Sequence, residues 1–287
     1  MQLAPEFLKV TYRRVRRIRN QRLLERAAPS VDAFLVSYPK SGRTWLRFLL
    51  SCYFAQIAEL DFEPDLHSTF RVLPNFDRDA ERGLPVFVGR AREVDLPLIA
   101  VSHRQFDARF FGGRPTIILV RDPRDVCVSA YFHETKHKHR FAGSIAEFIE
   151  NDTYGVPAIV RYHNDWAQGM AGSPSLIISY EDMSNNAEQT VRRIIEFLSL
   201  PVDEAALADA VEKARFSKMQ KTEKKTGIPG HDYDRSDEDS LRVRKGKVGG
   251  YADTLSEAEA NRIVAICRDN MVPAAKELMR QSDVALD

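Results

Sequence analysis

After Pro29, short apolar runs bounded by turn residues alternate with longer segments of helical periodicity. The runs are rich in β-branched and aromatic residues and nearly continuous in hydrophobicity, which is typical of parallel strands buried on both faces. The predicted strands span 32–38, 97–103, 115–121 and 175–181. The predicted helices span 43–58, about 123–133, 143–150, 157–169, 185–199, 203–214 and 256–280. We therefore expect an α/β fold with a central, mainly parallel sheet flanked by helices.

The N-terminal segment differs from this pattern in its charge. Residues 9–26 carry eight Lys or Arg and one Glu, a local charge of +7 that leaves −6 for the rest of the chain. Apolar residues recur among the arginines at helical spacing, at Leu8, Tyr12, Val15 and Ile18. We predict a basic amphipathic helix over 1–28, which either lies on an anionic membrane, grips an acidic acceptor, or is docked on the protein by its apolar stripe.

A second segment, 217–250, holds many Lys, Asp and Gly with little apolar periodicity. Long segments of this kind in compact domains are usually lids or binding loops. We therefore predict a mobile lid at 217–250, within a single domain that spans 29–287.

Composition narrows the class of protein. The chain of 287 residues is 44% hydrophobic and 29% charged, as expected of a soluble globular protein. Its net charge of +1 argues against a protein that coats nucleic acid. The three cysteines are widely spaced and fit a reducing compartment. Because neither a membrane-spanning run nor a signal-peptide pattern is found, we expect a cytoplasmic protein, peripheral at a membrane if the N-terminal helix binds one.

The first predicted strand runs directly into a loop rich in hydrogen-bond donors. The loop reads Tyr-Pro-Lys-Ser-Gly-Arg-Thr-Trp over 38–45, and a helical pattern follows at once. Gly42 permits a tight turn, and the first amides of a helix lack partners within it, so they bind phosphate or sulfate. Lys40, Ser41 and Thr44 add a cation and two hydroxyls. Because the lysine precedes the only glycine, the loop is not a Walker motif, which disfavours a nucleoside triphosphatase.

A second candidate segment lies where the third predicted strand ends. It reads Arg-Asp-Pro-Arg-Asp over 121–125 and continues into a helix that carries Ser129. In open α/β sheets, ligands bind beyond the carboxyl ends of the strands. The Lys40 loop, His103 and Arg121 all lie at such ends, so we expect them to form one site. A surface ion pair with a neighbouring aspartate is the alternative for Arg121 alone.

Together these motifs resemble the signatures of sulfotransferases, especially the cytosolic type, that use 3′-phosphoadenosine 5′-phosphosulfate (PAPS). The matching segments are the loop 38–45, the Arg-Asp-x-x-Asp-x-x-x-Ser run at 121–129 and Arg-Lys-Gly-Lys-Val-Gly-Gly at 244–250. They follow the family's order, and the resemblance extends over about 32–265. It implies a P-loop-like nucleotide-binding architecture and transfer of a sulfuryl group from PAPS to a hydroxyl, less often an amine, of a small-molecule, lipid or glycan acceptor.

The resemblance also implies roles for the matching residues. The 5′-phosphosulfate would lie on the Lys40 loop, with Ser41, Gly42, Thr44 and the loop amides as donors. Arg43 adds a cation to this nucleotide-binding loop and faces either the acceptor or solvent. The 3′-phosphate would be held by Arg121, Ser129, Arg244, Lys245 and Gly246. Arginine suits a phosphate because its planar fork donates paired charge-assisted hydrogen bonds. The adenine would lie among Trp45, Tyr180 and Phe216, of which the last two also fit as core aromatics.

His103 matches the histidine that similar sulfotransferases use as a general base. Removing the proton of an acceptor hydroxyl suits an imidazole at neutral pH. Lys40 would neutralise charge on the oxygen between phosphorus and sulfur, and Ser129 would restrain Lys40 until the acceptor binds. The transition state is expected to be loose, so positioning and electrostatics supply most of the rate, and no metal is required. The product nucleotide is adenosine 3′,5′-bisphosphate (PAP).

The sequence departs from the family pattern in several places. Arg43 stands where a threonine is usual, and Val101 stands where many relatives carry a lysine. Gly-Tyr at 250–251 replaces Asp-Trp, and the dimer motif is absent from 251–263, so the usual dimer is not assumed. The spacing of three further histidines fits no metal site: His133, His137 and His139.

Two alternatives stay open at this point. One is a nucleotide kinase-like phosphoryl transferase, which would need a Walker loop and Mg²⁺ ligands that the sequence lacks. The other is a binding protein: either a catalytically silent protein that holds the bisphosphate through the same loops, or a membrane adaptor that acts through its basic helix. A matching His103 and Lys40 favour catalysis over silence.

Overall fold

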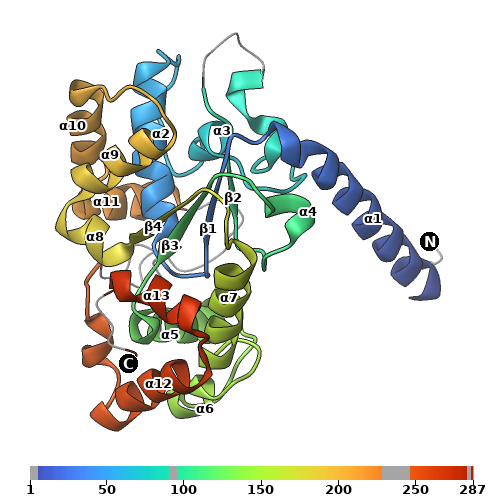
Figure 1. Ribbon diagram of the computed structural model, residues 1–287, viewed down its shortest axis with the longest axis vertical. Coiled ribbons are helices and arrows are strands. Elements are labelled where there is room, and N and C mark those ends of the chain that lie inside the picture. Colours follow the sequence, from blue (N-terminus) through green and yellow to red (C-terminus); the bar gives the residue numbers. More distant parts are fainter. Residues whose placement is uncertain (1–5, 91–95, 228–245, 283–285, 287) are drawn as a thin grey trace.

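Four parallel strands form the centre of the fold, in the order β2-β1-β3-β4 (Figure 1). The computed structural model describes residues 6–90, 96–227, 246–282 and 286. The strands are β1 (Ala33–Ser37), β2 (Ile99–Ser102), β3 (Thr116–Val120) and β4 (Ser175–Ser179). All four predicted strands are confirmed, with shorter ends. Burial along the whole strand holds for β1, β2 and β3, whereas β4, one of the two edge strands, begins exposed.

Helices flank the sheet, which confirms the α/β fold (Figure 1). The longer ones are α1 (Glu6–Ala27), α2 (Arg43–Ile57), α5 (Pro123–Phe132), α7 (Val156–Gly169), α9 (Ala187–Phe197), α10 (Glu204–Lys213), α11 (Phe216–Thr226) and α12 (Glu257–Asn270). The shorter ones are α3 (Thr69–Val72), α4 (Ala108–Phe111), α6 (Ile145–Ile149), α8 (Tyr180–Asn185) and α13 (Pro273–Met279). Helix α10 packs on α2, whereas α12 and α13 pack on α7.

The single helix predicted over 256–280 is wrong, because the chain forms α12 and α13 instead. A proline disfavours helical backbone at the preceding residue, and Val272 before Pro273 is extended with a ψ of 156°. Asn164 of α7 satisfies the backbone groups freed at this break. Its Nδ2 donates to the carbonyl oxygen of Asn270 at 2.9 Å, and its Oδ1 accepts from the Val272 N–H at 3.0 Å.

The start of the predicted lid, from residue 217, is helical instead, because α11 continues through Thr226. Met219 and Glu223, four residues apart, are both buried, so one face of this lysine-rich helix packs on the protein. Two buried residues, one of them a glutamate, are too few to give this helix an apolar periodicity in the sequence. The remainder of the predicted lid, 228–245, lies outside the described residues.

An aromatic cluster in the core supports the carboxyl end of β2. Phe34 contacts Phe76 and Phe111 edge to face, with ring centroids 5.0 and 4.8 Å apart, and Phe111 contacts Trp166 at 4.8 Å. The indole Nε1 of Trp166 donates to the carbonyl oxygen of Arg104 at 3.0 Å. Edge-to-face pairs add to the stabilisation from burial alone. The backbone just beyond β2 is therefore fixed to the core.

Helix α1 projects from the body of the protein, with the N-terminus at its far end (Figure 1). Its last turns contact the protein, where Leu24 is 2% exposed and Glu25 pairs with Arg109 at 3.2 Å. Val15 and Ile18 are 59% and 46% exposed, so docking of the helix by these two residues of the apolar stripe is wrong. Within the described residues, no helix is long and apolar enough to cross a membrane.

Candidate active site

The loop between β1 and α2 has an unusual backbone. Lys40 has a φ of 75° and Gly42 a φ of 94°, so two residues within three positions adopt the left-handed region. A Cβ on Gly42 would lie 2.3 Å from Cδ2 of Tyr180, so both the backbone angle and the neighbouring ring require glycine here. The turn leads into the first residue of α2, Arg43, whose N-cap is Gly42. The first amides of α2 therefore face the loop, where they can donate to an anion.

Ser41 and Arg121 carry buried donors that have no acceptor within the described part of the chain. The Ser41 side chain is 1% exposed, and its Oγ is buried without a hydrogen-bond partner there. Nε of Arg121 is likewise buried without a partner among those residues. Buried polar atoms in folded proteins are nearly always paired, so two orphan donors beside one loop indicate a place for a bound acceptor. A phosphate or sulfate oxygen fits both.

Arg121, at the carboxyl end of β3, connects two of the predicted segments. Its Nη1 donates to the carbonyl oxygen of Lys40 at 3.3 Å, and its Nη2 donates to that of Lys247 at 3.4 Å. Its guanidinium lies 4.0 Å from the centre of the Tyr180 ring. Thus the Lys40 loop, Arg121 and the segment beginning at Gly246 meet at one place. Arg244 and Lys245, predicted to contribute there, lie outside the described residues.

Asp125 on α5 holds the late segment against the site. Its side chain is buried, and its two oxygens accept from the N–H groups of Gly249 at 3.0 Å and Tyr251 at 2.8 Å. It also pairs with Arg121 at 3.4 Å, and Arg124 stacks over the Tyr251 ring at 4.2 Å. Burial raises the pKa of Asp125, and Arg121 opposes that rise. From the sequence alone, the only role predicted for this aspartate is that of a partner in a surface ion pair with Arg121.

Two of the three aromatics predicted near adenine lie together. The rings of Trp45 and Tyr180 are 5.6 Å apart, and Nε1 of Trp45 donates to the carbonyl oxygen of Ala214 at 2.9 Å. Tyr180 is 6% exposed and packs beneath Gly42, so it serves the core as well as the site. Phe216 begins α11, and its side chain lies outside the described part of the structure.

His103 follows β2, and its ring is oriented by the neighbouring strand. Its Nδ1 lies 2.6 Å from the carbonyl oxygen of Ser37, at the end of β1, and 3.5 Å from the Ser37 hydroxyl. A carbonyl only accepts, so Nδ1 carries the proton and donates it to that oxygen. In a neutral imidazole the lone pair is then on Nε2. This tautomer suits a base that acts through Nε2.

A cavity of about 310 Å³ joins His103 to the Lys40 loop. Lys40 and His103 both line it, so the predicted cation and base face one space. Its remaining walls include Tyr38, Tyr162, His133, Glu134, Arg140, Tyr154 and Arg161. Glu134 is buried and forms a two-pronged ion pair with Arg140 at 2.7 and 2.8 Å. Of these tyrosines and arginines, the sequence singles out only Tyr38, as the first residue of the loop 38–45. Nothing in the local pattern of the others points to the site.

The other predicted residues lie around this centre. Thr44 and Arg43 occupy the first turn of α2, and Ser129 lies half-buried on α5, next to the cavity residue Ala130. Gly246 has a φ of 58°. Val101 is 1% exposed within β2, so the position that bears a lysine in many similar enzymes belongs to the core here.

A buried carboxyl supports the start of α5. Glu181 is 2% exposed, and its Oε1 accepts from the N–H of Asp122 at 3.0 Å. Burial raises the pKa of Glu181 to about 7. Asp122 in turn caps α5 by accepting from the N–H of Arg124 and forms an ion pair with its side chain at 2.7 Å. The helix after Arg121 is therefore fixed at its beginning by two acids.

No group of three or more His, Cys, Asp or Glu side chains among the described residues is arranged to hold a metal ion. His133 and His137 lie on a single π-helical turn with ring centroids 5.3 Å apart. Both precede His139, which has a φ of 49°.

Comparisons with known proteins agree with this arrangement. The chain matches the family model of the sulfotransferase domain over residues 30–282. Sulfotransferase 2B1 of Mus musculus is 26% identical over 250 residues, which cover 84% of this chain and 71% of that protein. Sulfotransferase 1A1 of Rattus norvegicus is 26% identical over 255 residues, which cover 82% of each.

Solved structures show the same fold. Mouse sulfotransferase SULT7A1 complexed with PAP superposes with a TM-score of 0.58 at 20% identity, covering 88% of this chain and 89% of that one. Retinol dehydratase in complex with androsterone and the inactive cofactor PAP has a TM-score of 0.57 at 18% identity, covering 89% of this chain and 82% of that one. Because the family model spans nearly the whole chain, this chain belongs to the sulfotransferase domain family, and the prediction of a sulfotransferase is confirmed.

Proposed function

We propose that the protein transfers a sulfuryl group from PAPS to a hydroxyl or amine of an acceptor, with His103 as the general base. The observation that carries this proposal is the fixed tautomer of His103 in a cavity that Lys40 also lines. PAPS would supply the activated sulfuryl group, and its reaction releases PAP.

The residues at the donor side fit an anionic nucleotide. The orphan Oγ of Ser41, the amides that open α2 and the orphan Nε of Arg121 can all donate to phosphate or sulfate oxygens. Gly42 lets the Tyr180 ring approach the loop backbone, because a side chain at this position would collide with the ring. We assign Thr44, Ser129, Trp45 and Gly246 to the same nucleotide site on the strength of their positions.

At the acceptor side, Nε2 of His103 takes the proton of the attacking hydroxyl. The acceptor oxygen forms a bond to sulfur while the bond between sulfur and the bridging oxygen breaks. The Lys40 ammonium neutralises the charge that develops on that bridging oxygen, which then stays with the nucleotide. Ser37 keeps Nδ1 protonated throughout, so the imidazole becomes a cation hydrogen-bonded to a carbonyl.

The cavity favours a small or slender polar acceptor. Its volume of about 310 Å³ is at the lower end for ligand pockets. Its wall includes Arg140, Arg161 and Tyr154. The two guanidinium groups offer hydrogen-bond donors, and the tyrosine offers an aromatic ring. A small molecule, or the end of a lipid or glycan, therefore fits as the acceptor class.

A transfer assay with labelled PAPS and a panel of phenols, sterols, lipids and oligosaccharides tests this function. His103→Ala is expected to lower turnover about 10²- to 10⁴-fold while PAP binding stays within about twofold. Lys40→Ala is expected to lower turnover as well. His67→Ala, a change at an exposed histidine outside the cavity lining, is the matched control. Full activity in His103→Ala would exclude the proposed base.

PAP binding separates this proposal from the two alternatives. Because a ligand that binds only the folded state raises Tm, PAP should raise it more than ATP with Mg²⁺ does. A larger shift with ATP would favour a phosphoryl transferase. A shift with PAP but no transfer to any acceptor would favour a silent bisphosphate-binding protein.

A further inference from the structure

The outward face of α1 exposes apolar side chains between arginines. Four large hydrophobic residues are exposed in the described part of the chain, and two of them are Val15 and Ile18 on this helix. Arg19, Arg22 and Arg26 line the same shallow hollow as these two residues. Apolar side chains alternate there with guanidinium groups, over a surface that no other element of the described chain covers.

Val15 lies on the side of α1 opposite the buried Leu24. Val15 precedes Leu24, the residue buried against the body, by nine positions, which corresponds to a rotation of about 180° around a helix of 3.6 residues per turn. Ile18 follows Val15 by three positions and therefore lies on the same side. Among the described residues, the contacts that dock α1 thus leave Val15 and Ile18 exposed.

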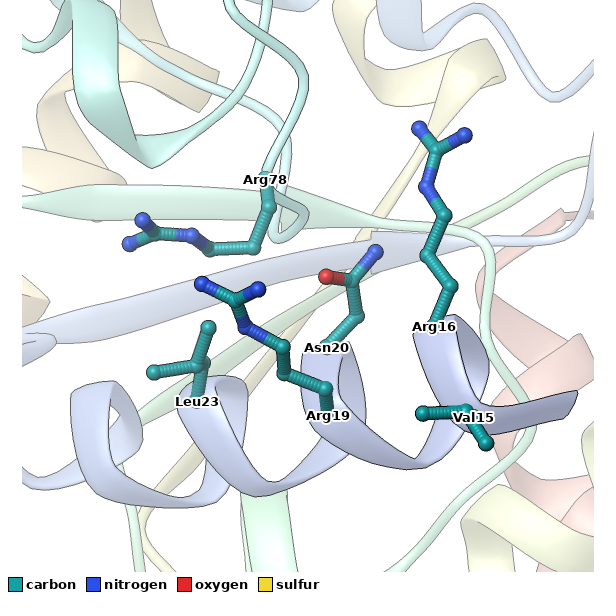
Figure 2. A pocket seen from close by; sticks show the side chains of 6 residues that line it. All are labelled: Val15, Arg16, Arg19, Asn20, Leu23 and Arg78. Carbon is teal, nitrogen blue, oxygen red and sulfur yellow. The ribbon is translucent and has the colours of Figure 1, made fainter. Parts of the chain in front are cut away.

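Six arginines of α1 have no acidic partner in the described part of the chain. Among the described residues, no carboxylate forms an ion pair with Arg14, Arg16, Arg17, Arg19, Arg22 or Arg26. A hollow of about 320 Å³ lies between α1 and Arg78 of the body. Figure 2 shows Arg19 of α1 extending toward Arg78 beside Asn20. The six residues that line this hollow include three arginines and no acid. Like charges gathered without a counter-charge indicate a binding surface for anions.

We propose that α1 binds the surface of an anionic membrane, with Val15 and Ile18 inserted at the level of the head groups and the surrounding arginines paired with lipid phosphates. Arginine stems can lie along apolar surface while their heads reach the phosphates. A nucleic acid would satisfy the arginines but leave Val15 and Ile18 exposed, so the apolar residues favour the membrane.

The position of α1 relates this surface to the active site. Arg16 and Arg17 line a further hollow with Arg104, the residue that follows His103. The positive surface therefore extends from α1 to the neighbourhood of the base. A membrane bound along α1 would bring lipid-borne molecules close to that end of the sheet. The binding itself does not depend on the proposed sulfuryl transfer.

Co-sedimentation of the full-length protein with vesicles tests the proposal. We expect binding to phosphatidylcholine vesicles that contain about one third phosphatidylserine, and little binding to pure phosphatidylcholine. Arg19→Gln with Arg22→Gln should weaken the partition coefficient about 30-fold at about 0.1 M salt, since each basic residue near such a surface contributes about fivefold. Val15→Ser with Ile18→Ser should weaken it at least about tenfold.

The matched control is Arg268→Gln with Arg280→Gln, two exposed arginines outside α1 that make the same change in net charge. It should bind the vesicles as the unchanged protein does. Equal binding to neutral and anionic vesicles would overturn the proposal, as would equal losses in the control and the α1 variant. If Val15→Ser with Ile18→Ser binds normally while the protein also binds duplex DNA through Arg19 and Arg22, the surface is a polyanion site and the membrane proposal fails. Unchanged Tm values would show that these exposed substitutions leave the fold intact.

Discussion

Substituting Gly42 by alanine tests the geometry of the nucleotide loop most directly. An L-residue at a φ of 94° costs about 1–2 kcal/mol relative to glycine. The new Cβ would also lie 2.3 Å from the Tyr180 ring, and overpacking of this kind costs about 1–3 kcal/mol. The free energy of unfolding should therefore fall by about 2–5 kcal/mol. For a chain of this size, that loss lowers Tm by about 4–10 °C.

Gly172→Ala separates the two contributions. Gly172 has a φ of 76°, but a Cβ there meets nothing within 4 Å, so only the backbone cost applies. Thermal unfolding followed by circular dichroism should show about half the loss of Gly42→Ala or less. In a double-mutant cycle, Gly42→Ala should cost less stability when Tyr180→Ala is also present, because the ring that the new Cβ meets is then gone. Equal losses for Gly42→Ala and Gly172→Ala, with no coupling to Tyr180, would refute the close approach of ring and loop.

Two further predictions follow from buried acids. In Asp125→Asn, the side-chain NH2 group faces one of the two backbone N–H groups that the carboxylate accepts from, so one of these hydrogen bonds is lost. Calorimetry should show PAP binding weakened about tenfold or more. The exposed control Asp269→Asn should bind PAP as the unchanged protein does. Glu181, with a folded pKa of about 7 raised from 4.5, makes stability fall as pH rises from about 4.5 to 7. His163, with a folded pKa of about 4 lowered from 6.5 by burial, makes stability fall as pH drops through that range. Denaturant titrations should thus show stability rising more steeply from about pH 4.5 to 6.5 in Glu181→Gln than in the unchanged protein, and an unaltered slope would count against the buried carboxyl.

Sequence patterns predict the sheet well because three of the four strands are buried along their whole length. A continuous apolar run needs no knowledge of its neighbours. The break before Pro273 was missed because helical periodicity continues on both sides of it, and the side chain of Asn164 that supports it comes from another helix. Helix α8 was missed because Ser179 ends a strand and caps a helix in one residue.

In the candidate site, too, some residues are predictable from the sequence and others are not. Lys40, Gly42, Arg121 and His103 were predicted because their chemistry and their places at strand ends are visible in the sequence. The left-handed backbone of Lys40 and the role of Asp125 were not, since both depend on contacts between segments far apart in the chain. The walls of the cavity were missed for the same reason, because residues such as Arg161 carry no local signal.

The way His103 is held has a consequence for how such an enzyme can diversify. Its ring is oriented by Ser37, and the backbone beyond it is fixed by Trp166, so the proton-accepting nitrogen is positioned from the sheet and the core. Tyr154 and Arg161 of the cavity wall take no part in these two hydrogen bonds. Replacing wall residues can therefore change which molecule is accepted without displacing the reactive nitrogen, so new substrate ranges can evolve while the chemical step is retained.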